Sequence, residues 1–140
     1  MAKKFRGAEI VKEIDEALDK GLARFLINTQ SKLAKASPVL TGRLASSWFI
    51  GKGVPDRSVA GERKGWKKGD SPIIDPPSVY TGKITLDSDW WISNSLPYAE
   101  RAAFDPYNGR VGAGDWFTRI ENNLAKDAER AFDYFLRKVK

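Results

Sequence analysis

The chain lacks two residue types on which most enzyme and metal sites depend, since it contains neither cysteine nor histidine. The absence of cysteine excludes disulfides and thiolate metal sites. The absence of histidine removes the commonest general base, the commonest zinc ligand and every nucleophile paired with a histidine. Any remaining acid–base chemistry would use carboxylates or lysines, and no cofactor is predicted.

Long apolar runs are also missing. No segment approaches the ~20 apolar residues that cross a bilayer, and the N-terminal Met-Ala-Lys-Lys lacks the apolar core of a signal peptide. We therefore expect a soluble protein that is made in the cytoplasm, is not exported and has no membrane contact. The formal net charge of +6 is spread along the chain. It favours contact with nucleic acid or acidic protein surfaces, although an ordinary soluble surface is the more common explanation.

The longest pattern in the sequence is helical and lies near the N-terminus. Apolar side chains recur every three or four residues from 8 to 36, which predicts one continuous helix. These residues are Val11, Ile14, Leu18, Leu22, Phe25, Thr29, Leu33 and Ala36. Pro38 is expected to end the helix because it disfavours a helical conformation at Ser37. Gly21, in the interior, indicates either a close packing contact or a slight bend.

A short corner follows this helix. Thr41 is a candidate N-cap for a helical turn through Leu44. Gly42 would let the backbone pass close to another element. Aromatic and β-branched residues from Trp48 to Ile50 then indicate the start of a strand.

The stretch from 51 to 82 has no sustained period, and it contains six of the twelve glycines and four of the seven prolines. It is predicted to be a long loop, and loops beyond roughly 15 residues are usually functional or disordered. Its centre combines an aromatic with basic residues: Arg63, Lys64, Trp66, Lys67 and Lys68. This composition suits stacking on bases and pairing with phosphates. A loop that becomes ordered on assembly is the more common explanation.

Two further elements complete the predicted fold. Alternation of apolar and polar residues from 83 to 94 predicts a strand or a strand pair that covers the first helix. Trp91 falls on the polar face, so it is either an exposed subunit contact or is buried by a bend near Asp89. An apolar stripe from 116 to 138 predicts a C-terminal helix. The expected fold is a single α+β domain with a long basic loop. Its long N-terminal helix and its C-terminal helix are expected to pack on a small, mainly antiparallel sheet and to bracket it.

The sequence does not predict an enzyme. Two pairs of carboxylates could be imagined as acid–base or magnesium sites, namely Asp87 with Asp89 and Asp70 with Asp75. Acidic residues are ordinary at turns and on solvated strand faces. A binding or assembly role is therefore the better hypothesis.

Two stretches resemble a known family: residues 37–47 (SPVLTGRLASS) and, about fifty residues later, residues 92–100 (ISNSLPYAE). Together with the long first helix and the last helix, they resemble the neck or tail-completion (minor tail) proteins of long-tailed bacteriophages. In that family a Pro-Val-x-Thr-Gly-x-Leu-x-x-Ser corner precedes a strand that ends in Asn and a Tyr-Ala pair. This chain departs from the pattern after Glu100, where Arg-Ala-Ala-Phe replaces a glycine-rich turn, and in its longer 51–82 loop.

The resemblance implies a non-enzymatic virion protein at the head–tail junction or the tail top. Its partners would be copies of itself in a ring of six, and neighbouring head-closure, tail-terminator or tail proteins. The long helix and the sheet edge would make the subunit contacts, and the basic loop would reach an adjacent ring or the DNA in the channel.

The residues given roles by this interpretation fall into two groups. Those that hold the corner are Pro38, Thr41, Gly42 and Leu44. Those that are candidate contacts with subunits or DNA are Arg63, Lys64, Trp66, Lys67, Lys68, Trp91 and Tyr98. The alternative function is a small cytoplasmic nucleic-acid-binding module that uses the loop around Trp66.

Overall fold

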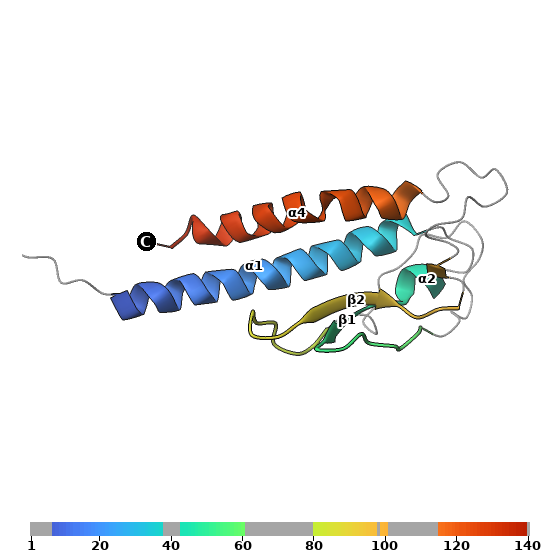
Figure 1. Cartoon of the computed structure of the whole chain (residues 1–140), viewed down its shortest axis with the longest axis horizontal. Helices are drawn as coiled ribbons and strands as arrows, with labels where there is room; N and C mark the ends of the chain where they lie inside the picture. Colours follow the sequence, from blue (N-terminus) through green and yellow to red (C-terminus); the bar gives the residue numbers. More distant parts are fainter. Residues whose placement is uncertain (1–6, 38–42, 61–79, 98, 101–114, 140) are drawn as a thin grey trace, which may run out of the picture.

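The computed structural model describes residues 7–37, 43–60, 80–97, 99–100 and 115–139. The elements, in chain order, are α1 (Gly7–Ala36), α2 (Arg43–Ser46), β1 (Trp48–Lys52), β2 (Trp90–Asn94) and α4 (Asp115–Leu136). Figure 1 shows α1 and α4 side by side along the long axis of the molecule, with the sheet on the other side of α1. The predicted α+β class is confirmed.

The arrangement of the two long helices differs from the prediction in one respect. They do not bracket the sheet, because α1 lies between α4 and the strands (Figure 1). The apolar stripe of α4 faces α1, and the N-terminal part of α4 also packs on the sheet, where Trp116 and Phe117 contact Trp48 and Ile120 joins the same cluster. The predicted packing of both terminal helices on a small antiparallel sheet is therefore confirmed. A single central helix therefore supports both the sheet and α4.

The helix α1 has the predicted length but is buried over a different set of residues. The buried residues are Ala17, Gly21, Leu26, Thr29, Gln30, Leu33 and Ala34. Val11 and Ile14, which the periodicity predicted to be part of the core stripe, are 58% and 36% exposed. Neither the sheet nor α4 covers the first turns of α1 (Figure 1). Leu26 and Ala34 are buried as well because α1 has neighbours on two sides.

Gly21 marks the closest approach of α1 to α4. A Cβ atom at this position would lie 2.6 Å from Phe132 Cδ1 and 3.0 Å from Phe132 Cα. The side chain of any other residue would therefore meet the backbone of α4. The sequence indicated either a close packing contact or a slight bend at Gly21, and the structure shows the packing contact.

The sheet formed by the described residues has two antiparallel strands, with Ile50 opposite Ile92. Trp48, Ile50 and Ile92 lie on the face that packs on the helices. The segment 53–60 passes over the opposite face, where a Cβ atom at Gly51 would lie 2.6 Å from the Asp56 amide nitrogen. The strand predicted from Trp48 is confirmed, and its face toward the helices forms the core.

The second strand is shorter than the alternation predicted. It begins at Trp90 rather than at residue 83, because the chain turns at residues 86–88. The Trp90 indole donates a hydrogen bond to the carbonyl of Thr85 (2.7 Å), which closes this turn. Ile84 is buried as predicted, but Leu86 is 47% exposed.

Two other boundaries, the start of the long loop and the end of the last helix, differ from the prediction. The predicted loop from 51 to 82 starts after Lys52, because Gly51 and Lys52 pair with β2. Residues 61–79 of that loop are outside the described part of the chain. The last helix ends at Leu136, and Arg137 and Lys138 follow it in a turn.

Candidate subunit-contact site

The two stretches that resemble the phage family meet in space at the end of β2. The Asn94 side-chain amide donates a hydrogen bond to the Leu44 carbonyl (2.9 Å), although the two residues are fifty positions apart in sequence. The Asn94 side-chain oxygen accepts a hydrogen bond from the Leu96 amide (3.2 Å). Leu44 and Leu96, 5% and 4% exposed, pack together with Ala99. An asparagine suits this position because its side chain can replace backbone partners where a strand ends.

Buried serines hold the same corner to α1. Ser37 Oγ donates to the Leu33 carbonyl (2.6 Å) and accepts from the Trp48 indole (2.8 Å). Ser47 is fully buried, and its Oγ accepts from the Ala60 amide (3.0 Å). Each hydroxyl thus has a hydrogen-bond partner, as buried polar groups usually do. These serines fix where α1 ends and where β1 begins.

Gln30 is a further polar contact that the sequence interpretation missed. Its side-chain amide is buried and donates to the Trp48 carbonyl at 2.7 Å. A polar residue directly after Thr29, on the buried side of the predicted helix, is the signal that could have identified it.

Of the residues predicted to hold the corner or to make contacts, the structure describes two, Leu44 and Trp91. Leu44 is buried at the corner, and Trp91 is 47% exposed on the face of the sheet that turns away from the helices. The remaining predicted residues lie outside the described part of the chain: Pro38, Thr41, Gly42, Arg63, Lys64, Trp66, Lys67, Lys68 and Tyr98.

Trp91 has the exposed position that the sequence left open. Its indole nitrogen donates to the Gly53 carbonyl at 3.3 Å, which holds the ring against the segment after β1. The bend of the chain at residues 86–88 precedes the strand and does not bury this ring. An exposed tryptophan held in place is a suitable anchor for a protein contact.

An apolar hollow of about 460 Å³ lies between α1, α4 and β2. Phe25, Leu33, Trp48 and Ile92 line much of it, and the carboxylates of Glu100 and Glu121 are also part of its wall. It offers apolar surface to a ligand or to another protein segment.

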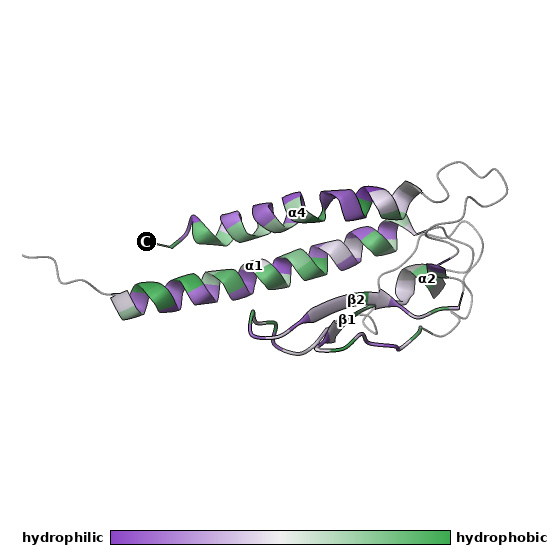
Figure 2. Cartoon of the chain, in the orientation of Figure 1, coloured by the Kyte–Doolittle hydropathy of each residue, from purple (hydrophilic) through white to green (hydrophobic). Residues whose placement is uncertain are grey.

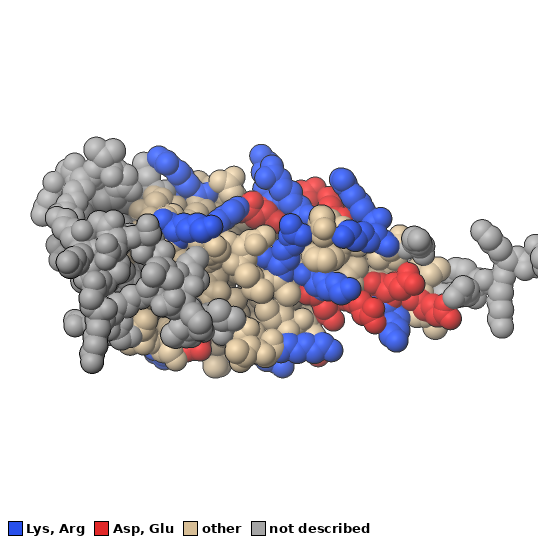
Figure 3. All heavy atoms as spheres, turned by 180° about the vertical axis from the view of Figure 1, so that it is seen from behind, with Lys and Arg blue, Asp and Glu red and all other residues tan. Residues whose placement is uncertain are grey.

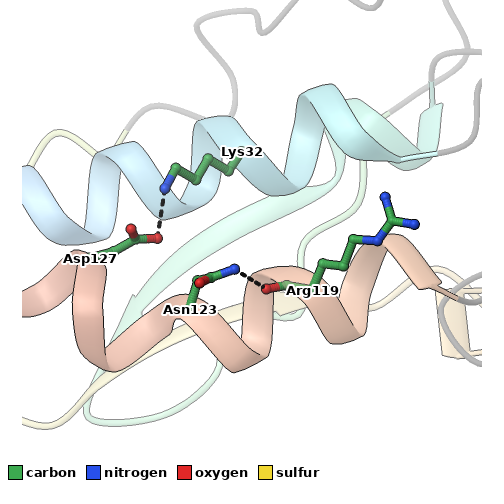
Figure 4. Close-up of polar contacts among 4 residues, drawn as sticks. All are labelled: Lys32, Arg119, Asn123 and Asp127. Atoms are coloured by element: carbon green, nitrogen blue, oxygen red, sulfur yellow. Dashed lines mark hydrogen bonds and ion pairs between the residues drawn. The ribbon is translucent and has the colours of Figure 1, made fainter.

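A second hollow, of about 400 Å³, follows the line where α1 meets α4, and we call it the seam groove. Its cations are Arg24, Lys32, Lys35 and Arg130, and its carboxylate is Asp127. Figure 4 shows Asp127 pointing from α4 toward Lys32, with 2.6 Å between the charged atoms, whereas Asn123 bonds to the Arg119 carbonyl within α4. The groove therefore keeps an excess of positive charge.

Tyr134 organises the cations at one end of the seam groove. The Arg24 guanidinium lies 4.2 Å from the centre of its ring, and so does the Lys138 ammonium. Lys138 also donates a hydrogen bond to the Tyr134 hydroxyl (3.0 Å). This hydrogen bond is the main cause that lowers the pKa of Tyr134, and the charges of Lys138 and Arg24 add to it. Two cations are thereby held at a fixed, exposed place.

Of the carboxylates considered for catalysis, Asp87 lies in the exposed turn before β2. Thr85 donates a hydrogen bond to Asp87, and this bond is the main cause that lowers the pKa of Asp87. Asp87 is thus an ionised side chain that stabilises an exposed turn. Asp70 and Asp75 lie outside the described residues. Among the described residues, no cluster of three or more acidic side chains is arranged to hold a metal ion.

The described helices do not include one that is long and apolar enough to cross a membrane. Comparison of the chain with protein-family models, with curated proteins and with solved structures gave no match.

Proposed function

We propose that this protein is a structural subunit of a tailed-phage virion, which forms part of the head–tail connector or completes the top of the tail. The observation that carries the proposal is the contact between the two stretches that resemble the family, made by the Asn94 side chain and the Leu44 carbonyl. Two short motifs that meet through their own residues form one local structure. The antiparallel pairing of Trp48 with Asn94 brings the two stretches side by side, and Asn94 and Leu96 of the second stretch contact Leu44 of the first.

The surface of the described part of the chain suits a subunit that contacts different neighbours through different faces. Val11, near the start of α1, is 58% exposed, and Trp91, on the sheet, is 47% exposed. Val11 lies beside two further exposed apolar residues, Ile10 and Ile14. Neighbouring exposed apolar side chains and an exposed tryptophan are features of surfaces that bind partners. Contacts between unlike surfaces generate rings when the rotation closes, and we expect a ring of six.

In this proposal the corner is structural and the loop is a contact. Leu44, Ser37 and Asn94 hold α1, α2 and β2 in register, and no chemistry is assigned to them. The basic residues at 63–68 are proposed to reach an adjacent ring or the DNA in the channel, because their charge and their tryptophan suit both. Head-closure, tail-terminator or tail proteins are the expected neighbours.

Location in particles tests the proposal. The protein is labelled in an infected culture, the particles are imaged by electron microscopy, and they are compared with particles made without it. Label at the head–tail joint, together with unattached heads and tails when the protein is missing, is the expected result. A wild-type copy supplied in trans should restore joining. Normal, unlabelled particles would refute the proposal.

The role of the loop has its own test in the same system. Reversal of the charges of Lys64, Lys67 and Lys68 should reduce infectivity or assembly, whereas reversal of Lys83, an exposed lysine outside this loop, should not. Unchanged infectivity in the triple variant would remove the loop from the proposal. Affinity for DNA that falls steeply with salt and weakens in Trp66→Ala would instead favour the nucleic-acid-binding function.

A further inference from the structure

The first turns of α1 form an apolar stripe that the described part of the chain covers only in part. We call residues 7–15 the free end of α1; Figure 1 shows it extending beyond the end of α4. Ile10, Val11 and Ile14 are 37%, 58% and 36% exposed, and Figure 2 shows hydrophobic residues continuing along these turns. Their spacing of three and four residues places them on one side of the helix.

Carboxylates border this stripe on both sides. Glu13 lies three residues after Ile10, and Asp15 lies four residues after Val11, so helical geometry places one on each flank. Glu9, Glu13 and Asp15 outnumber the single cation of the free end, Lys12. Figure 3 shows acidic side chains gathered toward this end of the molecule and many basic side chains over its middle.

The seam groove has the opposite character. Thr29 and Ala131 are buried at its base, and four cations and one carboxylate surround them. Arg24, Lys35 and Arg130 have no ion pair with a described residue, since Asp127 pairs with Lys32. Arg24 is held over the Tyr134 ring. The groove thus offers a few apolar contacts, from Phe25, Ala131 and the Tyr134 ring, among positive charges that are held in place or lack an ion pair with a described residue.

We propose that the free end of α1 of one copy docks in the seam groove of a second copy. The flanking carboxylates of the free end would meet the cations that border the groove. The apolar stripe would contact Phe25, Ala131 and the Tyr134 ring. The two surfaces are different parts of the same chain, so the contact is head-to-tail and each subunit uses both. This inference rests on the proposed function, because it names the contact between neighbours in the ring.

The expected contact is small and strongly dependent on salt. Nine helical residues rise about 14 Å, so this contact alone lies at the low end of specific interfaces. The charges lie at its border, where salt screens them within a Debye length of about 10 Å at 0.1 M. Association of the purified full-length protein should therefore be favoured at low salt and high protein concentration.

Charge reversal on each surface tests the contact by sedimentation velocity at 50 mM NaCl. Glu13→Lys and Arg130→Glu should each weaken self-association at least about tenfold, because each places like charges opposite one another. The matched control is Lys83→Glu, which makes the same change of charge on an exposed residue away from both surfaces. It should associate like the wild type. Circular dichroism should show the same helix content in all variants.

A mixture of the two variants provides the decisive measurement. The free end with Glu13→Lys fits the groove with Arg130→Glu, and the unchanged free end of the second variant fits the unchanged groove of the first. The mixture should therefore regain association that neither variant shows alone. Failure of the mixture to do so would overturn the proposal, as would single variants that associate like the wild type.

Two further outcomes separate this inference from its alternatives. A protein that stays monomeric at low salt but binds DNA, and loses that binding in Arg130→Glu, would overturn the inference and make the groove a nucleic-acid site. Self-association that survives both reversals would reject this interface and leave the ring function standing. Normal particles made without the protein would reject the ring function, whatever the purified protein does.

Discussion

Replacement of Gly21 by alanine separates two physical effects of opposite sign. Helix propensity alone predicts that Gly21→Ala stabilises α1 by about 1 kcal/mol. The structure predicts the reverse, because the new Cβ would lie 3.0 Å from Phe132 Cα and 2.6 Å from Phe132 Cδ1. The ring can rotate away, but the α4 backbone cannot move without separating the helices. Overpacking of this kind costs about 1–3 kcal/mol, so we expect a net loss of about 1 kcal/mol.

The measurement is urea unfolding, followed by circular dichroism and fitted for the free energy of unfolding. Gly21→Val should lose more than Gly21→Ala, since it adds two further methyl groups at the same contact. Asn28→Ala is the matched control: this exposed residue of α1 should gain about 0.5 kcal/mol from propensity alone. A Gly21→Ala protein more stable than the wild type would refute the close packing of α1 on α4.

Two other changes test the corner and the seam groove. Ser37→Ala should lower the free energy of unfolding by about 1–3 kcal/mol, because the buried Trp48 indole loses its acceptor; the loss should shrink in a Trp48→Phe background, and equal losses in both backgrounds would contradict the bond. The phenol of Tyr134, followed by NMR of ¹³C-labelled tyrosine, should titrate below its ordinary pKa of 10.0 and return toward it in Lys138→Met. Because folding lowers this pKa, the resulting stabilisation is fully present above the ordinary pKa and is lost as the pH falls through the folded value. An unchanged midpoint in Lys138→Met would contradict the cause.

The helices and the first strand could be predicted from the sequence because their signals are local. Periodicity placed the first helix at 8–36, one residue from the observed start at Gly7. It did not reveal which residues of α1 are buried. A stripe of period 3.6 describes one face, whereas α1 has α4 on one side and the sheet on the other, so Leu26 and Ala34 are buried outside the stripe.

The start of β2 could not be predicted because a short alternation also occurs in turns. Ile84 and Leu86 continue the pattern of Trp90 and Ile92, yet the chain turns at 86–88. What decides the boundary is pairing with β1, whose last residue, Lys52, lies opposite Trp90. One more backbone bond, from the Gly53 amide to the Asp89 carbonyl (2.7 Å), follows this pair. Such a limit is set by a distant segment and leaves no mark in the local sequence.

The candidate site was predictable only in part for the same reason. Leu44 follows from its place in the motif, but the role of Asn94 depends on a carbonyl fifty residues away. The seam groove combines cations of two helices. Arg24, Lys32 and Lys35 recur at helical spacing on α1, which could have indicated one basic side, but Arg130 joins them only through the packing of α4.

Because α1 is one unbroken helix, it fixes the direction of the free end relative to the seam groove. Each helical residue turns the chain by about 100° and advances it by about 1.5 Å. Ile14 on the free end and Arg24 in the seam groove lie on one helix, so the number of residues between them sets both their separation and their relative direction. One residue more or less in this interval would turn the apolar stripe by more than a quarter of a circle. The curvature of any assembly built through these two surfaces is therefore determined by the length of a single helical segment.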